Sequence, residues 1–156
     1  MYDPVLYPPL CDEDAIVCVV YPKKQFEGTT FESAAFQVRE IRRPLEEMTP
    51  VVCVTPSTKT DDEERFSFLI SAQHPEEMIG GVLFVHGDAG GVAAGHGISV
   101  DLYRAFHRPN CYELRLRQSG GSPGDFDPPK KTLTHAMQKD MDESLSEILH
   151  SFRFLE

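Results

Sequence analysis

The chain of 156 residues is long enough to bury one hydrophobic core, and we expect a single domain over residues 1–156. Its 40% hydrophobic and 26% charged residues are typical of a globular protein. A formal net charge of −10 disfavours nucleic acid and anionic membrane surfaces as partners, because both repel an acidic protein. No apolar run approaches the roughly 20 residues that a transmembrane helix needs.

The N-terminus reads MYDPVLYPPLCDED and predicts an extended arm over residues 1–14, since prolines, tyrosines and acidic residues dominate it. It lacks the basic start, apolar core and small-residue cleavage site of a signal peptide. If Met1 is the native start, we expect a cytoplasmic protein whose four cysteines are reduced thiols. These cysteines form no CxxC pair, which argues against a structural zinc site.

Short β-branched runs predict the first strands. Strands are expected over Ala15–Tyr21 and Val51–Thr55, and a proline follows each run. Phe31–Ile41 fits a helical stripe and a strand alternation equally well, and we favour a turn at Thr30–Ser33 followed by a strand.

Between these runs and the hairpin described next, the chain predicts short elements joined by loops. Four consecutive acidic residues in one loop do not match the alternating ligands of an EF-hand, so we expect this loop to be solvated. The elements are one or two helical turns within 42–50, the polar loop over 57–64, a strand over 66–70, a connection over 74–81 and a strand over 82–85.

A β-hairpin is the clearest local signal in the chain. Tyr112, Leu114 and Leu116 alternate with charged residues, the pattern of a strand with one buried face. Pro109–Asn110 provides the turn chemistry that joins this strand to a short strand over 102–106. In this hairpin Arg104 and Glu113 can face each other.

An amphipathic helix is predicted near the C-terminus, after a glycine-rich break over 118–124 and with Thr134 as a suitable N-cap. Its apolar stripe consists of Met137, Met141, Leu145, Ile148, Leu149 and Phe152. Because strands come first and the helix last, we expect an α+β fold, an antiparallel sheet of about five to seven strands covered by helices, with the C-terminal helix packed on one face.

The segments YRAFHRPNCYEL, DAGG and ILHSFRFL together resemble a bacterial domain of unknown function that is often found in exported proteins and lipoproteins. FEGTTFESAAFQV and the cysteine run at 51–53 resemble its N-terminal half, so the similarity covers about Tyr21 to Leu155. More loosely, the order of elements is similar to Mog1p/PsbP-like domains. The resemblance implies an antiparallel sheet with helical cover and no established activity. It also implies an alternative, an exported protein with a Cys53–Cys111 disulfide.

The glycine-rich stretch 86–99, which we expect to be a flexible loop, carries the candidate functional residues. It lacks the GxxxxGK[ST] pattern of a phosphate-binding loop and the GxSxG pattern of a nucleophile elbow. His86, Asp88 and His96 offer metal-binding nitrogen and oxygen atoms, but without a defining spacing they are weak metal candidates. No cofactor is indicated.

Loops on a rigid sheet commonly carry recognition, and glycine lets the backbone approach a ligand closely. We therefore expect a non-catalytic binding or protein-interaction module that uses this loop and the adjoining hairpin. The candidate binding residues are His86, Asp88, His96, Tyr103, Arg104 and His107. The alternative is a small metal-assisted or thiol-dependent enzyme at the same loop, the latter with Cys111 and His107 as a catalytic pair. Exposed strand edges and an apolar N-terminal arm favour a homodimer over a monomer.

Overall fold

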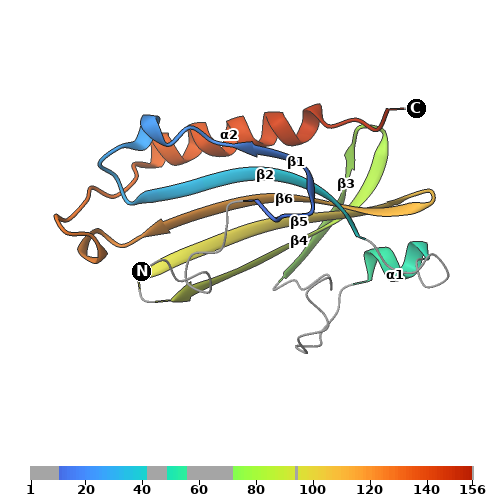
Figure 1. Cartoon of the computed structure of the whole chain (residues 1–156), viewed down its shortest axis with the longest axis horizontal. Coiled ribbons are helices and arrows are strands. Elements are labelled where there is room, and N and C mark those ends of the chain that lie inside the picture. The colour runs from blue at the N-terminus through green and yellow to red at the C-terminus, as the bar shows by residue number, and fades with distance from the viewer. Residues whose placement is uncertain (1–10, 42–48, 56–71, 94, 156) are drawn as a thin grey trace.

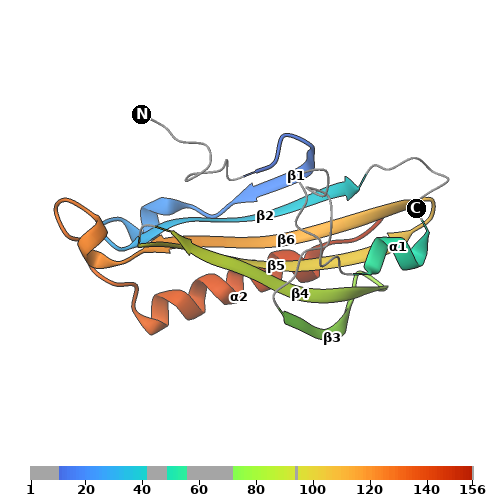
Figure 2. The ribbon, with the colours of Figure 1, turned by 90° about the horizontal axis from the view of Figure 1, so that it is seen from below.

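The structure, a computed structural model, describes residues 11–41, 49–55, 72–93 and 95–155. Within these residues the chain forms one six-stranded antiparallel sheet with the order β1-β2-β6-β5-β4-β3 (Figure 1). The strands are β1 (Ala15–Val20), β2 (Phe31–Ile41), β3 (Ala72–Ile79), β4 (Val82–Ala93), β5 (His96–His107) and β6 (Asn110–Gly121). The predicted α+β class with an antiparallel sheet is confirmed. Figure 2 shows β1 and β3 at the two edges of the sheet.

The long helix α2 (His135–Ser151) lies along one face of the sheet (Figure 1). The predicted N-cap is confirmed, because the Thr134 side chain accepts a hydrogen bond from the backbone N–H of Met137 at 3.2 Å. Met141, Leu145 and Leu149 are each 1% exposed and belong to the same core as the sheet residues Phe36 and Leu114. Burial of each such side chain contributes about 1.5–3 kcal/mol, so this contact is a main source of stability.

The predicted hairpin is also confirmed. β5 and β6 pair from His96↔Gly121 to His107↔Asn110, with Arg104 opposite Glu113. Successive side chains alternate between the two faces, so Tyr103 and Leu114 face α2 while Arg104 and Glu113 lie on the other face. The register of this hairpin therefore fixes which side chains can meet α2.

The strand predicted over Val51–Thr55 is wrong, because these residues form the short helix α1 (Pro50–Val54). The Thr49 side chain caps this helix by accepting from the Val52 N–H at 3.2 Å, and Pro50 occupies its first turn. These helix-start signals and the tertiary contacts outweigh the β-preference of three valines. α1 lies on the side of the sheet opposite α2 (Figure 1).

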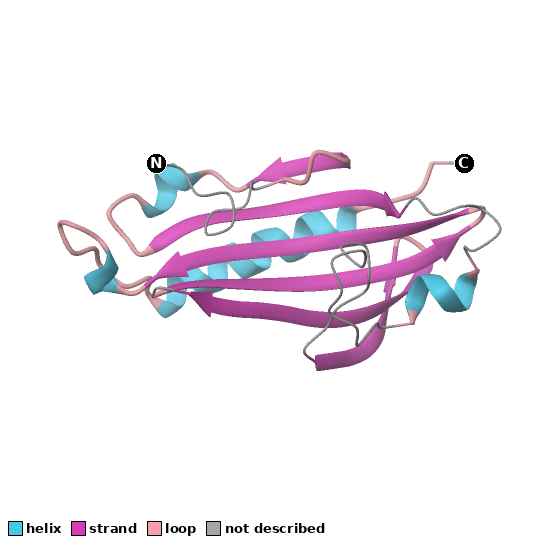
Figure 3. Cartoon of the chain, turned by 60° about the horizontal axis from the view of Figure 1, so that its bottom comes forward, coloured by secondary structure: helices cyan, strands magenta, loops and turns pink. Residues whose placement is uncertain are grey.

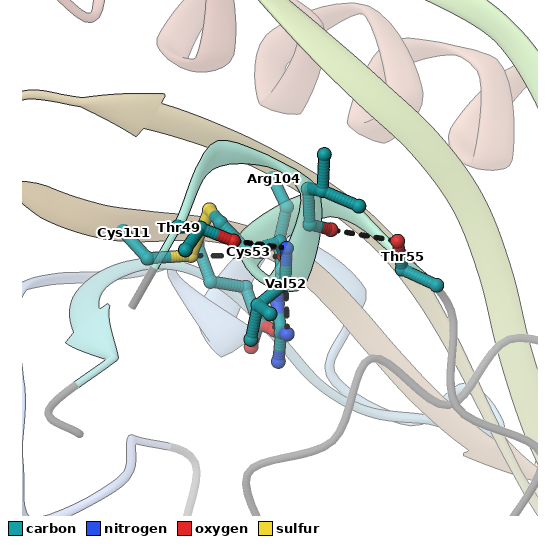
Figure 4. Close-up of a disulfide and its surroundings, with 8 residues drawn as sticks. Thr49, Val52, Cys53, Thr55, Arg104 and Cys111 are labelled. Atoms are coloured by element: carbon teal, nitrogen blue, oxygen red, sulfur yellow. Dashed lines mark hydrogen bonds and ion pairs between the residues drawn. A yellow bond between two sulfur atoms is a disulfide. The ribbon is translucent and has the colours of Figure 1, made fainter. Parts of the chain in front are cut away.

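The expectation of reduced thiols is wrong, because all four cysteines form disulfides. Cys53–Cys111 joins α1 to the start of β6 with 5.5 Å between Cα atoms, and Figure 4 shows this bond beside Arg104. Cys11–Cys18 joins the turn before β1 to the strand itself, with 6.1 Å between Cα atoms. Both Cα separations lie in the normal range for disulfides. No local sequence pattern predicts that Cys53 pairs with Cys111, because these residues are 58 positions apart and meet only in the folded chain.

Two stretches expected to be connections are strands. β3 occupies most of the connection expected over 74–81, and the tight turn to β4 consists of Gly80 and Gly81, whose φ values are 60° and 83°. The loop expected over 86–99 is wrong, because β4 continues to Ala93 and β5 begins at His96 (Figure 3). Backbone pairing with neighbouring strands needs no side chains, so glycines can continue a ladder inside a sheet.

The remaining expectations divide between described and undescribed residues. β1 confirms the strand expected over Ala15–Tyr21, and β2 confirms that Phe31–Ile41 contains a strand. The turn favoured at Thr30–Ser33 is wrong, because β2 already begins at Phe31. β6 extends to Gly121, into the break expected over 118–124, before the one-turn η3 (Pro123–Asp125). The arm over 1–10, the helical turns over 42–48, the loop over 57–64 and the strand over 66–70 lie outside the described residues.

Candidate functional site

A groove follows one side of α2, on the sheet face that α2 shares. α2 packs over β2 and β6, and at its C-terminal end it contacts β3. Two hollows, of about 540 and 310 Å³, lie between the helix and the strands and share Gln118 as a lining residue. We call the pair the α2 groove.

The larger hollow has glycines where the rest of the sheet carries side chains. Its floor includes Gly90, Gly97 and Gly120, from three adjacent strands, and the register pairs Gly97 with Gly120. Leu133 and Met141 provide apolar walls. Among these three glycines, Gly97 leaves room for a side chain, since a Cβ there would lie 3.8 Å from its nearest neighbours. A Cβ at Gly90 would lie 2.7 Å from the carbonyl oxygen of Ile98, and one at Gly120 would lie 3.1 Å from that of Thr30, so glycine at these two positions lets backbones approach closely.

The smaller hollow combines an apolar floor with polar walls. Leu145 and Leu149 of α2 lie at its base, and Glu77, Asp101 and Tyr103 line its side. Burial raises the pKa of the Tyr103 phenol, and the carboxylates of Asp101 and Glu77 raise it further. Tyr103 is therefore a neutral hydrogen-bonding group at physiological pH rather than a base.

Three rings form a ladder across β3, β4 and β5 beside this hollow. His74 pairs with His86, His86 pairs with Tyr103, and the ring centroids are 4.7 and 4.1 Å apart. Asp88 and Asp101 are directly opposite each other on neighbouring strands, an arrangement that destabilises a sheet unless the charges are compensated. His74 Nε2 lies 2.9 Å from Asp88 Oδ2, and His86 Nε2 lies 3.1 Å from Asp101 Oδ1, so each carboxylate has a hydrogen-bond partner.

A third histidine–carboxylate pair joins α2 to β3. His150 Nε2 lies 2.8 Å from Glu77 Oε1, while its Nδ1 donates to the backbone carbonyl of Ser146 at 2.7 Å. The Ser146 hydroxyl is 3.3 Å from the same Nδ1. Since that nitrogen carries a proton for the carbonyl, it cannot take one from the hydroxyl, and these residues do not form a catalytic triad.

The structure brings together three of the six predicted binding residues and separates the others. His86, Asp88 and Tyr103 lie side by side on β4 and β5. His96 is at the far end of β5, where its Nδ1 is 2.6 Å from Glu32 Oε1. His107 is at the opposite end and stacks on Phe154 at 4.1 Å, and Arg104 lies on the face away from α2.

The weak metal set His86, Asp88 and His96 does not converge. Among the described residues, no group of three or more histidine, cysteine or acidic side chains is arranged to hold a metal ion. The expected Cys111–His107 pair has no thiol, because Cys111 is in a disulfide. Glu77, Asp101 and His150 were missed. Of these, Asp101 could have been found from the sequence. In His86-x-Asp88 and Asp101-x-Tyr103 it is two residues from the predicted Tyr103, and alternate residues of a strand share a face.

Arg104 belongs to a buried ionic cluster on the other face of the sheet. Glu113, which is 1% exposed, accepts from the Nε atoms of Arg39 at 2.9 Å, Arg104 at 2.7 Å and Arg115 at 2.5 Å. Burial opposes ionisation of Glu113, but the charges of the three arginines together hold the pKa of this carboxyl below its usual range. Arg104 Nη1 also lies 3.5 Å from the carbonyl oxygen of Cys53 (Figure 4). This cluster connects β2, β5, β6 and α1, and we assign it a structural role.

No family model, curated protein or solved structure matches the chain. None of the helices within the described residues has the length and apolar character to span a membrane.

Proposed function

We propose that this protein is a non-catalytic binding module whose ligand lies in the α2 groove. The observation that carries the proposal is the run of glycines on three adjacent strands beside a packed helix. Open space next to a well-packed core loses van der Waals contacts, and a ligand in the groove would restore them. Compared with the expected flexible loop, paired strands offer a more rigid floor, which lowers the entropy cost of binding.

The two halves of the groove favour an elongated ligand with two chemically different ends. An apolar body suits the glycine half, where Leu133 and Met141 form the wall. A cationic or hydrogen-bond-donating head suits the other half, which is lined by Glu77, Asp101 and Asp142. The ligand class is therefore an organic amine or an extended segment with a basic side chain.

The enzyme alternative has less support. A thiol-dependent reaction needs a free cysteine, and the four cysteines are in disulfides. A metal-assisted reaction needs converging ligands, and His96 lies away from His86 and Asp88.

We further propose that the protein works in an oxidising compartment, as the resembling exported proteins do, because two disulfides are unstable in a reducing cytoplasm. Mass spectrometry of native protein tests this directly. Reduction should add four hydrogens, two per disulfide, and an unchanged mass would contradict the proposal. The finer resemblance of the sheet and helix to Mog1p/PsbP-like domains stays a prediction.

Binding can be tested with a matched pair of small probes, hexylamine and hexanoate, which share an apolar tail and differ in charge. We expect hexylamine to shift the backbone amide NMR signals of Gly90, Ser99 and Gln118, and hexanoate to shift them much less. Ser99→Trp should block the effect by filling the groove. Ala136→Trp, an exposed position of α2 outside the groove lining, serves as the control. If both probes leave the groove signals unchanged, the proposal fails.

A further inference from the structure

The two edges of the sheet differ in their protection against pairing with another strand. β3 carries Pro75, which has no N–H to donate, and the charged residues Glu76 and Glu77. β1 reads AIVCVV and has neither proline nor charge. Natural proteins rarely leave such an edge open, because it is a template for association.

β1 also exposes apolar side chains on both of its faces. Val17 and Val19 lie on the α2 face, opposite Val38 and Phe36 of β2, whereas Val20 lies on the other face opposite Ala35. The exposed fractions are 55% for Ile16, 43% for Val17, 40% for Val19 and 49% for Val20. A helix laid on one face would cover only part of this set. A strand added beside β1 covers both faces at once.

The charges that flank β1 are complementary under a two-fold axis. The acidic residues Glu13 and Asp14 precede the strand, and Lys24 follows it. When a strand pairs antiparallel with its own copy, the start of one lies beside the end of the other. A pairing centred between Val17 and Cys18 puts Ala15 opposite Val20 of the second copy, so the turn that holds Glu13 and Asp14 lies near the end of the second β1, which Lys24 follows.

We propose that β1 is a homodimer interface at which two copies pair antiparallel and their sheets join into one. The occupant of the edge is a second copy because this strand supplies both the apolar surface and the opposite charges that the contact needs. Backbone hydrogen bonds between the strands provide the attraction, and the valines and Ile16 provide the apolar burial. The dimer leaves the α2 groove free, since none of its lining residues belongs to β1.

Sedimentation velocity of the full oxidised chain, from low to high micromolar concentration, tests the proposal. A one-strand interface is small, so we expect a micromolar dissociation constant and a species of twice 17.5 kDa at the upper end. Val17→Lys and Val19→Lys should each raise the dissociation constant about tenfold or more, since they put a charge into the contact. Met78→Lys, at the 59% exposed apolar residue of β3, is the matched control and should leave the dimer intact.

A charge-reversal pair tests the two-fold arrangement without altering the apolar strand. Asp14→Lys should weaken the dimer, and the double variant Asp14→Lys with Lys24→Asp should restore it. Circular dichroism confirms that each variant remains folded. A wild-type chain that stays at 17.5 kDa over the whole range overturns the proposal. So does a dimer that survives both valine substitutions, or one that Met78→Lys dissociates.

Discussion

Glu113→Gln should destabilise the protein by several kcal/mol, although the substitution hardly changes the shape of the side chain. The carboxylate is 1% exposed and compensates Arg39 and Arg104, whose side chains are 5% and 4% exposed. Without it, the two guanidinium groups become buried charges with reduced compensation, which costs about 3–5 kcal/mol. With a urea slope of about 2 kcal/mol per M, the unfolding midpoint should fall by about 2 M.

The pH dependence of stability provides an independent test of the same cluster. Because the pKa of folded Glu113 lies below that of the unfolded chain, its contribution is fully present above the unfolded pKa of about 4.3 and is lost as the pH falls through the folded pKa. The stability difference between wild type and variant should therefore be largest near neutral pH and narrow in acid.

Urea titrations of wild type and variant at a series of pH values measure both effects. Glu143→Gln is the matched control, since Glu143 is 62% exposed in an i,i+4 pair with Lys139 and should cost about 0.5 kcal/mol or less. A loss below about 1 kcal/mol for Glu113→Gln at neutral pH would show that Glu113 does not stabilise the buried arginines, as would a difference that does not change with pH.

Three further predictions concern stability, each measurable by chemical denaturation. Replacing Cys53 and Cys111 by serine should cost about 4 kcal/mol, against about 2 kcal/mol for Cys11 and Cys18, because the loops closed span 58 and 7 residues; equal losses would contradict the loop argument. Leu145→Ala should cost about 2–5 kcal/mol because the side chain is 1% exposed, whereas Leu155→Ala, at 95% exposure, should cost almost nothing. Gly81→Ala should cost about 1–2 kcal/mol because its φ is 83°, while Gly91→Ala, with open space and no positive φ, should be neutral. A tolerated Gly81→Ala would show that the turn relaxes.

The elements predicted correctly are those whose pattern also describes their packing. The stripe through Met141, Leu145 and Leu149 marks the face that α2 buries, and the alternation through Tyr112, Leu114 and Leu116 marks one strand of the hairpin. In both cases the local period and the tertiary environment agree, so a short window of sequence is sufficient.

The failures have a common physical cause, since the deciding interactions are distant in sequence. The valines of α1 favour a strand, but Cys53 is held by Cys111, 58 residues away. The Thr49 cap is the exception, because it is a local signal that the valines outweighed in the prediction. Gly90 and Gly97 favour a loop, but β5 and β6 pair with the strands that contain them. Propensity is a weak guide where partners supply the hydrogen bonds.

The candidate site could be predicted only in part from the sequence, because some of its contacts join residues that are distant in sequence. The sequence shows His86, Asp88 and Tyr103, and alternation puts them on one face of their strands. It does not show that α2 brings His150 to Glu77, because that contact joins residues 73 positions apart. His96 and His107 were grouped with the others because a loop was expected to bend them together. Two extended strands hold them at opposite ends of β5 instead.

Paramagnetic mapping can show whether the α2 groove binds a ligand with an apolar body and a cationic head. The nitroxide 4-amino-TEMPO combines a compact apolar ring, an amine and an unpaired electron that broadens nearby NMR signals. We expect the amides of Gly90, Ser99 and Gly120 to broaden first, and Ser99→Trp to abolish the effect. Broadening that is uniform over the surface, or strongest at α1 or β1, would contradict this expectation.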